Sequence, residues 1–201
     1  MSEATEEGAG LPRGRWGRVV AGLGVATAVA AAIWSSSLPL WLGVRVYSEQ
    51  LLVAVLAGSL AMVFLTRRWN REVGGRPAWF DLALAAAALA WGAALAARFP
   101  VISQNIFYHP TEALAFSCVG LPLLVEGVRR AMGWSLLAIL FAICGYALFA
   151  DQFTGVLQNR AIGPERLATF LVLDSAGMAG AALYIAVAVV FPFLILAQLL
   201  I

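Results

Sequence analysis

The chain has 201 residues, of which 62% are hydrophobic and 12% are charged, and its formal net charge is +2. Soluble domains of this size carry about 25% charged residues and about 45–50% apolar residues. The composition therefore excludes an ordinary soluble domain, a disordered chain and a nucleic-acid-binding protein built on basic patches. Two cysteines are too few for a disulfide-rich secreted module. We expect a protein of the lipid bilayer, with membrane lipids and no nucleic acid among its partners.

Charged residues divide the chain into uncharged stretches, of which six are candidate membrane spans. A spanning helix needs about 20 apolar residues, within a range of about 17–25. The fourth stretch reaches that length only if Glu112 or Glu126 lies inside the helix. We predict an all-α polytopic fold of about six transmembrane spans, based on Val19–Val44, Gln50–Thr66, Leu82–Ala97, Ala113–Val125, Ala131–Ala150 and Ser175–Ile201.

Arginine placement predicts which side of the membrane each loop faces, because cytoplasmic loops are enriched in basic residues. Nine of the 13 arginines precede the first span or lie between spans two and three or spans four and five. The amino terminus is therefore expected in the cytoplasm, and four tryptophans at the same boundaries fit the aromatic belt of a membrane interface. These residues are Arg13, Arg15, Arg18, Arg67, Arg68, Arg71, Arg76, Arg129 and Arg130, with Trp16, Trp69, Trp79 and Trp134.

The first span has one competing interpretation. Arg13–Arg18, followed by Val19–Ile33 and the small residues Ser35–Ser37, resembles a secretory signal peptide. The acidic residues before this segment and the apolar run that resumes at Leu38 favour a retained helix. Residues 1–15 are polar and acidic, which predicts a disordered cytoplasmic tail.

Side chains able to perform chemistry are scarce. Cys118 and Cys144 lie in different predicted helices without metal-ligand spacing, so we expect small buried packing residues. His109 lies in a predicted outer loop and has no second histidine or cysteine with which to share a metal. The sequence shows no nucleophile with a base in reach, no glycine-rich phosphate loop and no paired acids on one helix. We therefore expect no enzyme activity, no cofactor and no metal site.

Ionisable residues near the ends of the predicted spans could have a structural or a functional role. Glu126 precedes Arg129 by three residues and Arg130 by four, so the three share one face of a helix. One interpretation is a neutralised helix end in which Glu126 pairs with the arginines, and the other is an ion or proton relay. The position of Glu126 near the predicted boundary favours the structural interpretation. Glu112 follows Pro110 at a predicted helix start, where a carboxylate suits the positive end of the helix dipole.

The last predicted loop differs from the others in its sequence pattern. Gly163, Pro164 and Glu165 predict a helix start, since proline is tolerated at the first helical position. Leu167 and Phe170 then give this segment an apolar side. We expect a short amphipathic helix in the last outer loop, either lying in the membrane interface or re-entrant and buried against a partner.

Several short motifs occur in an order typical of one transporter family. They are a Glu-x-x-Arg-Arg-x-x-Gly-Trp pattern at Glu126, Arg129, Arg130, Gly133 and Trp134, the helix end Tyr146–Phe149, Glu165 with Arg166, Gly177–Gly180 and, upstream, Pro77, Trp79, Phe80 and Asp81. In the order and spacing of these motifs, the chain resembles the membrane permease of a tripartite ATP-independent periplasmic (TRAP) transporter of the TAXI type.

The resemblance implies an accessory subunit of a secondary transporter in the bacterial inner membrane. Such systems take up organic acids or related solutes from a periplasmic solute-binding protein, driven by a sodium or proton gradient. Residues 16–110 would then be a three-helix region like a small subunit, and residues 111–201 would resemble the start of the permease. Because these permeases are usually longer, the chain would be a separate small subunit or the leading portion of a divided permease. The coupling ion would bind in the partner subunit.

The resemblance further implies that the chain braces the large permease subunit and helps to dock the periplasmic solute-binding protein. Glu126, Arg129, Arg130 and Trp134 are the candidate structural or interface residues. A membrane anchor or assembly factor of another complex fits the hydropathy and topology equally well, but it does not account for the ordered motifs. An independent channel fits least well, because the sequence shows no repeated polar face.

Overall fold

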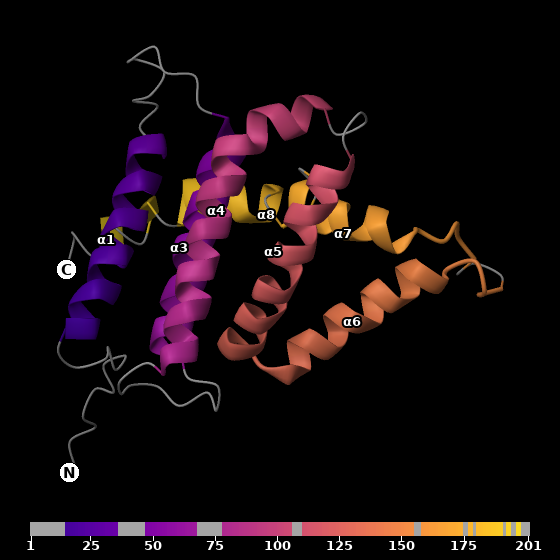
Figure 1. Ribbon diagram of the computed structural model, residues 1–201, viewed down its shortest axis with the longest axis horizontal. Helices are drawn as coiled ribbons and strands as arrows, with labels where there is room; N and C mark the ends of the chain where they lie inside the picture. Colours follow the sequence, from indigo (N-terminus) through magenta and orange to yellow (C-terminus); the bar gives the residue numbers. More distant parts are fainter. Residues whose placement is uncertain are drawn as a thin grey trace, which may run out of the picture.

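The computed structural model describes residues 15–35, 47–67, 78–105, 110–154, 158–174, 177–178, 180–190, 192–193 and 196–197. These residues are predominantly helical, and none of them forms a β-strand. The elements are α1 (Arg15–Ser35), α3 (Ser48–Thr66), α4 (Trp79–Asn105), α5 (Pro110–Ala131), α6 (Trp134–Phe149), α7 (Pro164–Leu173), α8 (Ala181–Ile185) and a π-helical turn (Ala186–Val190). In Figure 1, α1, α3, α4 and α5 alternate in direction and form a bundle.

Four of the described helices are long and apolar enough to cross a membrane, which is consistent with a multi-pass membrane protein. They correspond to the first four predicted spans. The fourth, α5, reaches the length of a span because both Glu112 and Glu126 lie inside the helix. At about 1.5 Å per residue, the 16 residues of α6 extend only about 24 Å, less than the hydrocarbon core of about 30 Å. In the sixth predicted stretch the described elements are α8 and the π-helical turn. The count of six spans therefore stays a prediction.

Small residues on facing helices let α3 pack closely against its neighbours. α3 contacts α1, α4 and α5. A side chain added at Gly58 would overlap Thr27 of α1, one at Gly92 of α4 would overlap Ala57, and one at Gly127 of α5 would overlap Leu60. Such close approach is typical of membrane helices, whose association depends on van der Waals packing.

Replacing Gly92 by alanine is expected to lower the free energy of unfolding by about 1–3 kcal/mol, because the new methyl group would push α3 and α4 apart. Gly145 of α6 is the matched control, since nothing lies within 4 Å of the Cβ atom that alanine would add. Alanine at Gly145 should stabilise its helix by about 0.5–1 kcal/mol. Unfolding of both variants in detergent, followed by circular dichroism, checks the difference, and equal stabilities would contradict the packing.

A proline inside α4 leaves one backbone carbonyl without its helical partner. Pro100 has no N–H group, so the carbonyl of Ala96 lacks the usual bond from four residues ahead. The Gln50 side chain of α3 donates a hydrogen bond to this carbonyl, with an Nε2–O distance of 2.7 Å. Its Oε1 atom also accepts a bond from the backbone N–H of Tyr47 at 3.1 Å. One glutamine therefore caps the start of α3 and replaces the hydrogen bond that Pro100 removes from α4.

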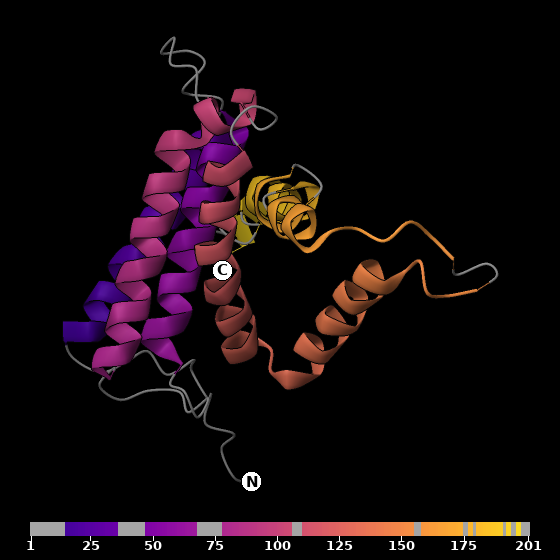
Figure 2. The same ribbon diagram turned by 45° about the vertical axis from the view of Figure 1, so that its right-hand side comes forward.

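Beyond α5 the chain leaves the bundle and then returns to it. Gly133 turns the chain with a positive φ of 98°, a conformation that favours glycine, and α6 then extends away from α5 (Figure 2). The predicted short helix at Pro164 is confirmed as α7, and Gly163 is its N-cap residue. α7 packs against α5, and its buried Val172 and Leu173 belong to the main hydrophobic core. This contact is made within the chain, so the expected placements in the membrane interface or against a partner both stay predictions.

Several sequence predictions fall wholly or partly outside the described residues. Arg15 begins α1, whereas the rest of the predicted tail lies outside them. Also outside are His109 and five of the residues used to predict the orientation, namely Arg13, Arg68, Trp69, Arg71 and Arg76. The main core contains residues from both sides of position 110, including Leu60 of α3 and Leu124 of α5. The division into regions 16–110 and 111–201 stays a prediction.

Candidate functional site

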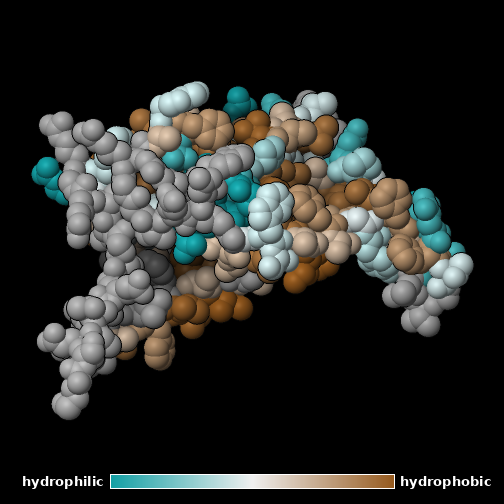
Figure 3. Space-filling view, turned by 90° about the horizontal axis from the view of Figure 1, so that it is seen from below, coloured by the Kyte–Doolittle hydropathy of each residue, from teal (hydrophilic) through white to brown (hydrophobic). Residues whose placement is uncertain are grey.

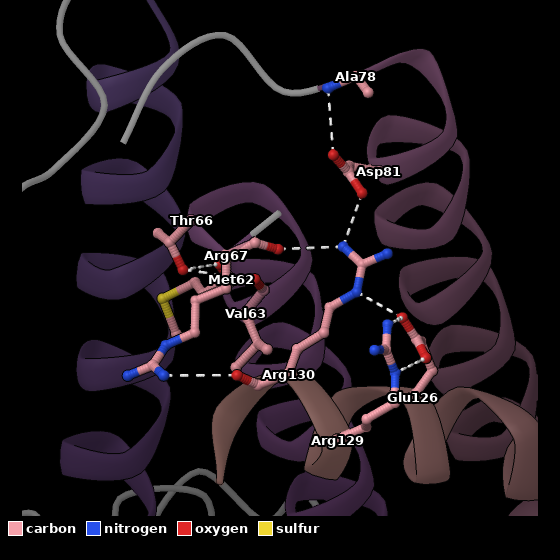
Figure 4. Close-up of polar contacts among 9 residues, drawn as sticks. All are labelled: Met62, Val63, Thr66, Arg67, Ala78, Asp81, Glu126, Arg129 and Arg130. Carbon is pink, nitrogen blue, oxygen red and sulfur yellow. Dashed lines mark hydrogen bonds and ion pairs between the residues drawn. The ribbon is translucent and has the colours of Figure 1, made fainter. Parts of the chain in front are cut away.

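A cluster of charged side chains joins the ends of three helices. Because α3, α4 and α5 alternate in direction, the end of α3, the start of α4 and the end of α5 meet at one end of the bundle (Figure 1). We define the ion cluster as Arg67, Asp81, Glu126, Arg129 and Arg130, whose contacts are shown in Figure 4. Every member makes a hydrogen bond or an ion pair with another member.

Arg130 is the centre of this cluster. Its side chain is fully buried, with Nη1 at 2.6 Å from Oδ1 of Asp81 and Nε at 2.6 Å from Oε1 of Glu126. Nη1 also donates to the carbonyl of Arg67 at 3.0 Å, and the guanidinium lies 5.2 Å from the ring centroid of Phe64. The remaining donor, Nη2, is buried without a hydrogen-bond partner among the described residues. Arg130 thus contacts both neighbouring helices as well as its own.

Glu126 links the two arginines of α5. Its carboxylate accepts two bonds from Arg129, from Nε to Oε2 and from Nη2 to Oε1, each at 2.7 Å. The Arg129 guanidinium lies 5.8 Å from the ring centroid of Trp134, which is 63% exposed. The structure therefore contains the pairing of Glu126 with both arginines that the helical spacing predicts. Contact of these residues with a partner stays a prediction.

Asp81 has two structural roles at the start of α4. Its Oδ2 atom accepts the backbone N–H of Ala78 at 3.1 Å, which satisfies a donor at the helix start. Its Oδ1 atom pairs with Arg130. The sequence motif includes Asp81 but does not predict its pairing with Arg130. An aspartate in the first turn of a span, at the end of the bundle rich in arginine, was the available signal.

Arg67 was also missed as a member of the cluster. It is the C-cap residue of α3, and its Nη1 atom donates to the carbonyl of Ala131 at 3.0 Å and, more weakly, to that of Arg130 at 3.4 Å. These carbonyls belong to the last turn of α5, where helical partners are lacking. In the sequence, Arg67 contributes only to the predicted orientation, because its contact with α5 depends on how α3 and α5 pack.

The geometry of the ion cluster favours the structural interpretation over the relay. Both carboxylates are held by arginine side chains, and the cluster is confined to one end of the bundle. Glu112, in the first turn of the same helix, instead faces Arg98 at 3.9 Å with both side chains exposed. Within the described part of the chain, no group of three or more His, Cys, Asp or Glu side chains could hold a metal.

One expectation about the cysteines is wrong. Cys118 is exposed and Cys144 is partly exposed, and both are free thiols. Cys118 follows the fully buried Ser117 on α5, so it lies on a different side of the helix from that inward-facing residue. Apolar character alone did not reveal which side of α5 faces other helices.

Comparisons with protein-family models, with curated proteins and with solved structures find no match to this chain. The resemblance to TRAP permeases therefore rests on the order of the sequence motifs. The fold and the contacts of the ion cluster are known from the structure of this chain and do not depend on comparison with a relative.

Proposed function

We propose that the chain is a structural membrane subunit of a TRAP-type secondary transporter, which braces a large transport subunit during uptake of organic acids or related solutes. The order of the sequence motifs supports the family assignment. The buried ion cluster is the observation that carries the bracing role, because it joins α3, α4 and α5 at one end of the bundle.

A transport subunit that moves needs a partner that keeps its shape. Removing one member of a buried ion pair costs about 3–5 kcal/mol, so the cluster resists separation of the helices that it connects. The close contacts of α3 with α1 and α4 restrict the same bundle along its length. These features support a bundle that moves as one unit and resists the lateral forces of its partner.

The proposed location is the bacterial inner membrane, with the ion cluster at the cytoplasmic end. Arg67, Arg129 and Arg130 lie at the end of the bundle where α1 begins (Figure 1). Basic residues favour the cytoplasmic side, which supports this orientation. The loops at the opposite end would help to dock the periplasmic solute-binding protein. The large subunit would supply the site for the sodium ion or proton that drives uptake.

Uptake by liposomes tests this proposal. The probes are labelled dicarboxylates, amino acids and sugar acids, supplied under an inward sodium or proton gradient together with periplasmic extract from the host. We expect no uptake by the chain alone, and uptake when the liposomes also contain the larger membrane protein that purifies with it. Uptake by the chain alone would contradict the bracing role. Absence of uptake from both preparations would favour a membrane anchor or assembly factor of another complex.

A further inference from the structure

The segment that leaves the bundle has little protein around it. We define the arm as Trp134–Leu173, which comprises α6, its connection and α7. Among the residues of α6, Leu137 alone is buried. Figure 3 shows apolar side chains along the arm and hydrophilic ones at its far end. The exposed apolar residues of α6 include Leu136, Ile139, Phe141, Ile143 and Phe149.

The far end of the arm lies level with the middle of the bundle. This placement is visible in Figures 1 and 2, which share the same vertical axis. The described residues 150–154 and 158–163 at this end are not helical, and Asp151, Gln152 and Arg160 are exposed. In a spanning bundle this level corresponds to the hydrocarbon core. Non-helical backbone is tolerated at that depth only when protein buries it or when it lines a water-filled cavity.

A pocket of about 450 Å³ at this end has both basic and apolar walls. Arg160 and Arg166 line it together with Ile162, Leu167 and Phe170. Within the described part of the chain, neither guanidinium has an ion-pair partner. Guanidinium groups pair with carboxylates through parallel hydrogen bonds, and two of them beside apolar walls suit an acidic side chain on an apolar helix.

We propose that the arm docks against a second, different polytopic membrane protein, which covers α6 and places a carboxylate between Arg160 and Arg166. This inference rests on the proposed function, in which the chain braces a larger subunit, and identifies the surface that makes the contact. A lipid fits poorly, because acyl chains cannot pair with arginine or with non-helical backbone.

A second copy of the chain is the less favoured occupant. Among the described acidic residues outside the arm, Glu49, Asp81, Glu112 and Glu126 lie at the ends of the bundle, away from the level of the pocket. Asp174 directly follows α7, and Asp151 and Glu165 lie in the arm itself. A copy could therefore offer these three acids only by bringing two arginine-lined arms together.

Site-specific photocrosslinking of the full chain in membranes of its own host tests the inference. A photoreactive residue replaces Ile143 of α6, which is 61% exposed, and the control position is Val25 of α1, which is 63% exposed. We expect position 143, but not position 25, to capture one polytopic membrane protein. The paired substitutions Arg160→Glu and Arg166→Glu should reduce this capture about tenfold or more. An acid-to-arginine change at the matching site of the captured protein should restore it.

Three results would overturn the inference: adducts with lipid only, adducts with a second copy, or capture that the two substitutions leave unchanged. The substituted arginines are exposed, so an unaltered thermal transition of the purified variant excludes unfolding as the cause of lost capture. If capture depends on the two arginines but the captured protein transports no solute, the arm is a docking surface and the proposed transporter function is wrong. If the reconstituted liposomes take up solute but position 143 forms adducts only with lipid, the docking role of the arm is wrong and the proposed transporter function stands.

Discussion

Replacing Asp81 by alanine is expected to lower the free energy of unfolding by about 3–5 kcal/mol. The substitution removes the carboxylate that lies 2.6 Å from Nη1 of Arg130 and leaves a fully buried guanidinium with one acidic partner fewer. It also removes the acceptor of the Ala78 N–H group at the start of α4. Titration of mixed detergent micelles with SDS, followed by tryptophan fluorescence, measures the loss, because Trp91 is buried in the bundle.

Two further variants make this result specific to the buried pair. Asp151→Ala changes an exposed aspartate in the arm and should alter stability by about 0.5 kcal/mol or less. The double variant Asp81→Leu with Arg130→Met removes both charges, and it should be more stable than Asp81→Ala alone, because no unpaired buried arginine remains. The single variants Asp81→Leu and Arg130→Met complete the double-mutant cycle, and a double variant whose loss equals the sum of their losses would contradict a direct interaction between Asp81 and Arg130.

Replacing Glu126 by alanine should be almost as damaging, with an expected loss of about 3 kcal/mol. This one carboxylate accepts hydrogen bonds from both Arg129 and Arg130, so its removal leaves two neighbouring cations without their shared partner. Glu112→Ala in the same helix is the matched control. Glu112 and Arg98 are exposed and 3.9 Å apart, and such pairs contribute about 1 kcal/mol or less.

Thermal unfolding in detergent measures both glutamate variants under the same conditions. A large loss for Glu126→Ala and a small loss for Glu112→Ala would support the structural role of the cluster. If Glu126→Ala leaves stability unchanged, the ion cluster does not hold the helix ends together. That result would favour the interpretation of Glu126 as part of an ion or proton relay.

Much of the bundle could be predicted from the sequence, because charges mark where apolar helices end. The runs between charged residues predicted α1, α3, α4 and α5, and the spacing of Glu126, Arg129 and Arg130 predicted their common face. The turn chemistry of Gly163 and Pro164 likewise predicted the start of α7. Each of these predictions depends on residues that lie close together in the chain.

Features that depend on contacts between distant residues could not be predicted in this way. Asp81 and Arg130 are 49 positions apart, and their pairing requires a particular packing of α4 on α5. Hydropathy also treats every apolar run alike, so it did not show that α6 leaves the bundle after Gly133. For the same reason it did not distinguish the exposed side of α5, where Cys118 lies, from the buried side.

Native mass spectrometry of the tagged full chain, purified from its own host in mild detergent, tests the central claim most directly. A structural subunit should be recovered with one larger polytopic membrane protein in a fixed ratio, and the pair should persist at detergent concentrations that remove bound lipid. Recovery of the chain alone, or only as self-associated copies, would contradict the subunit role and favour a membrane anchor.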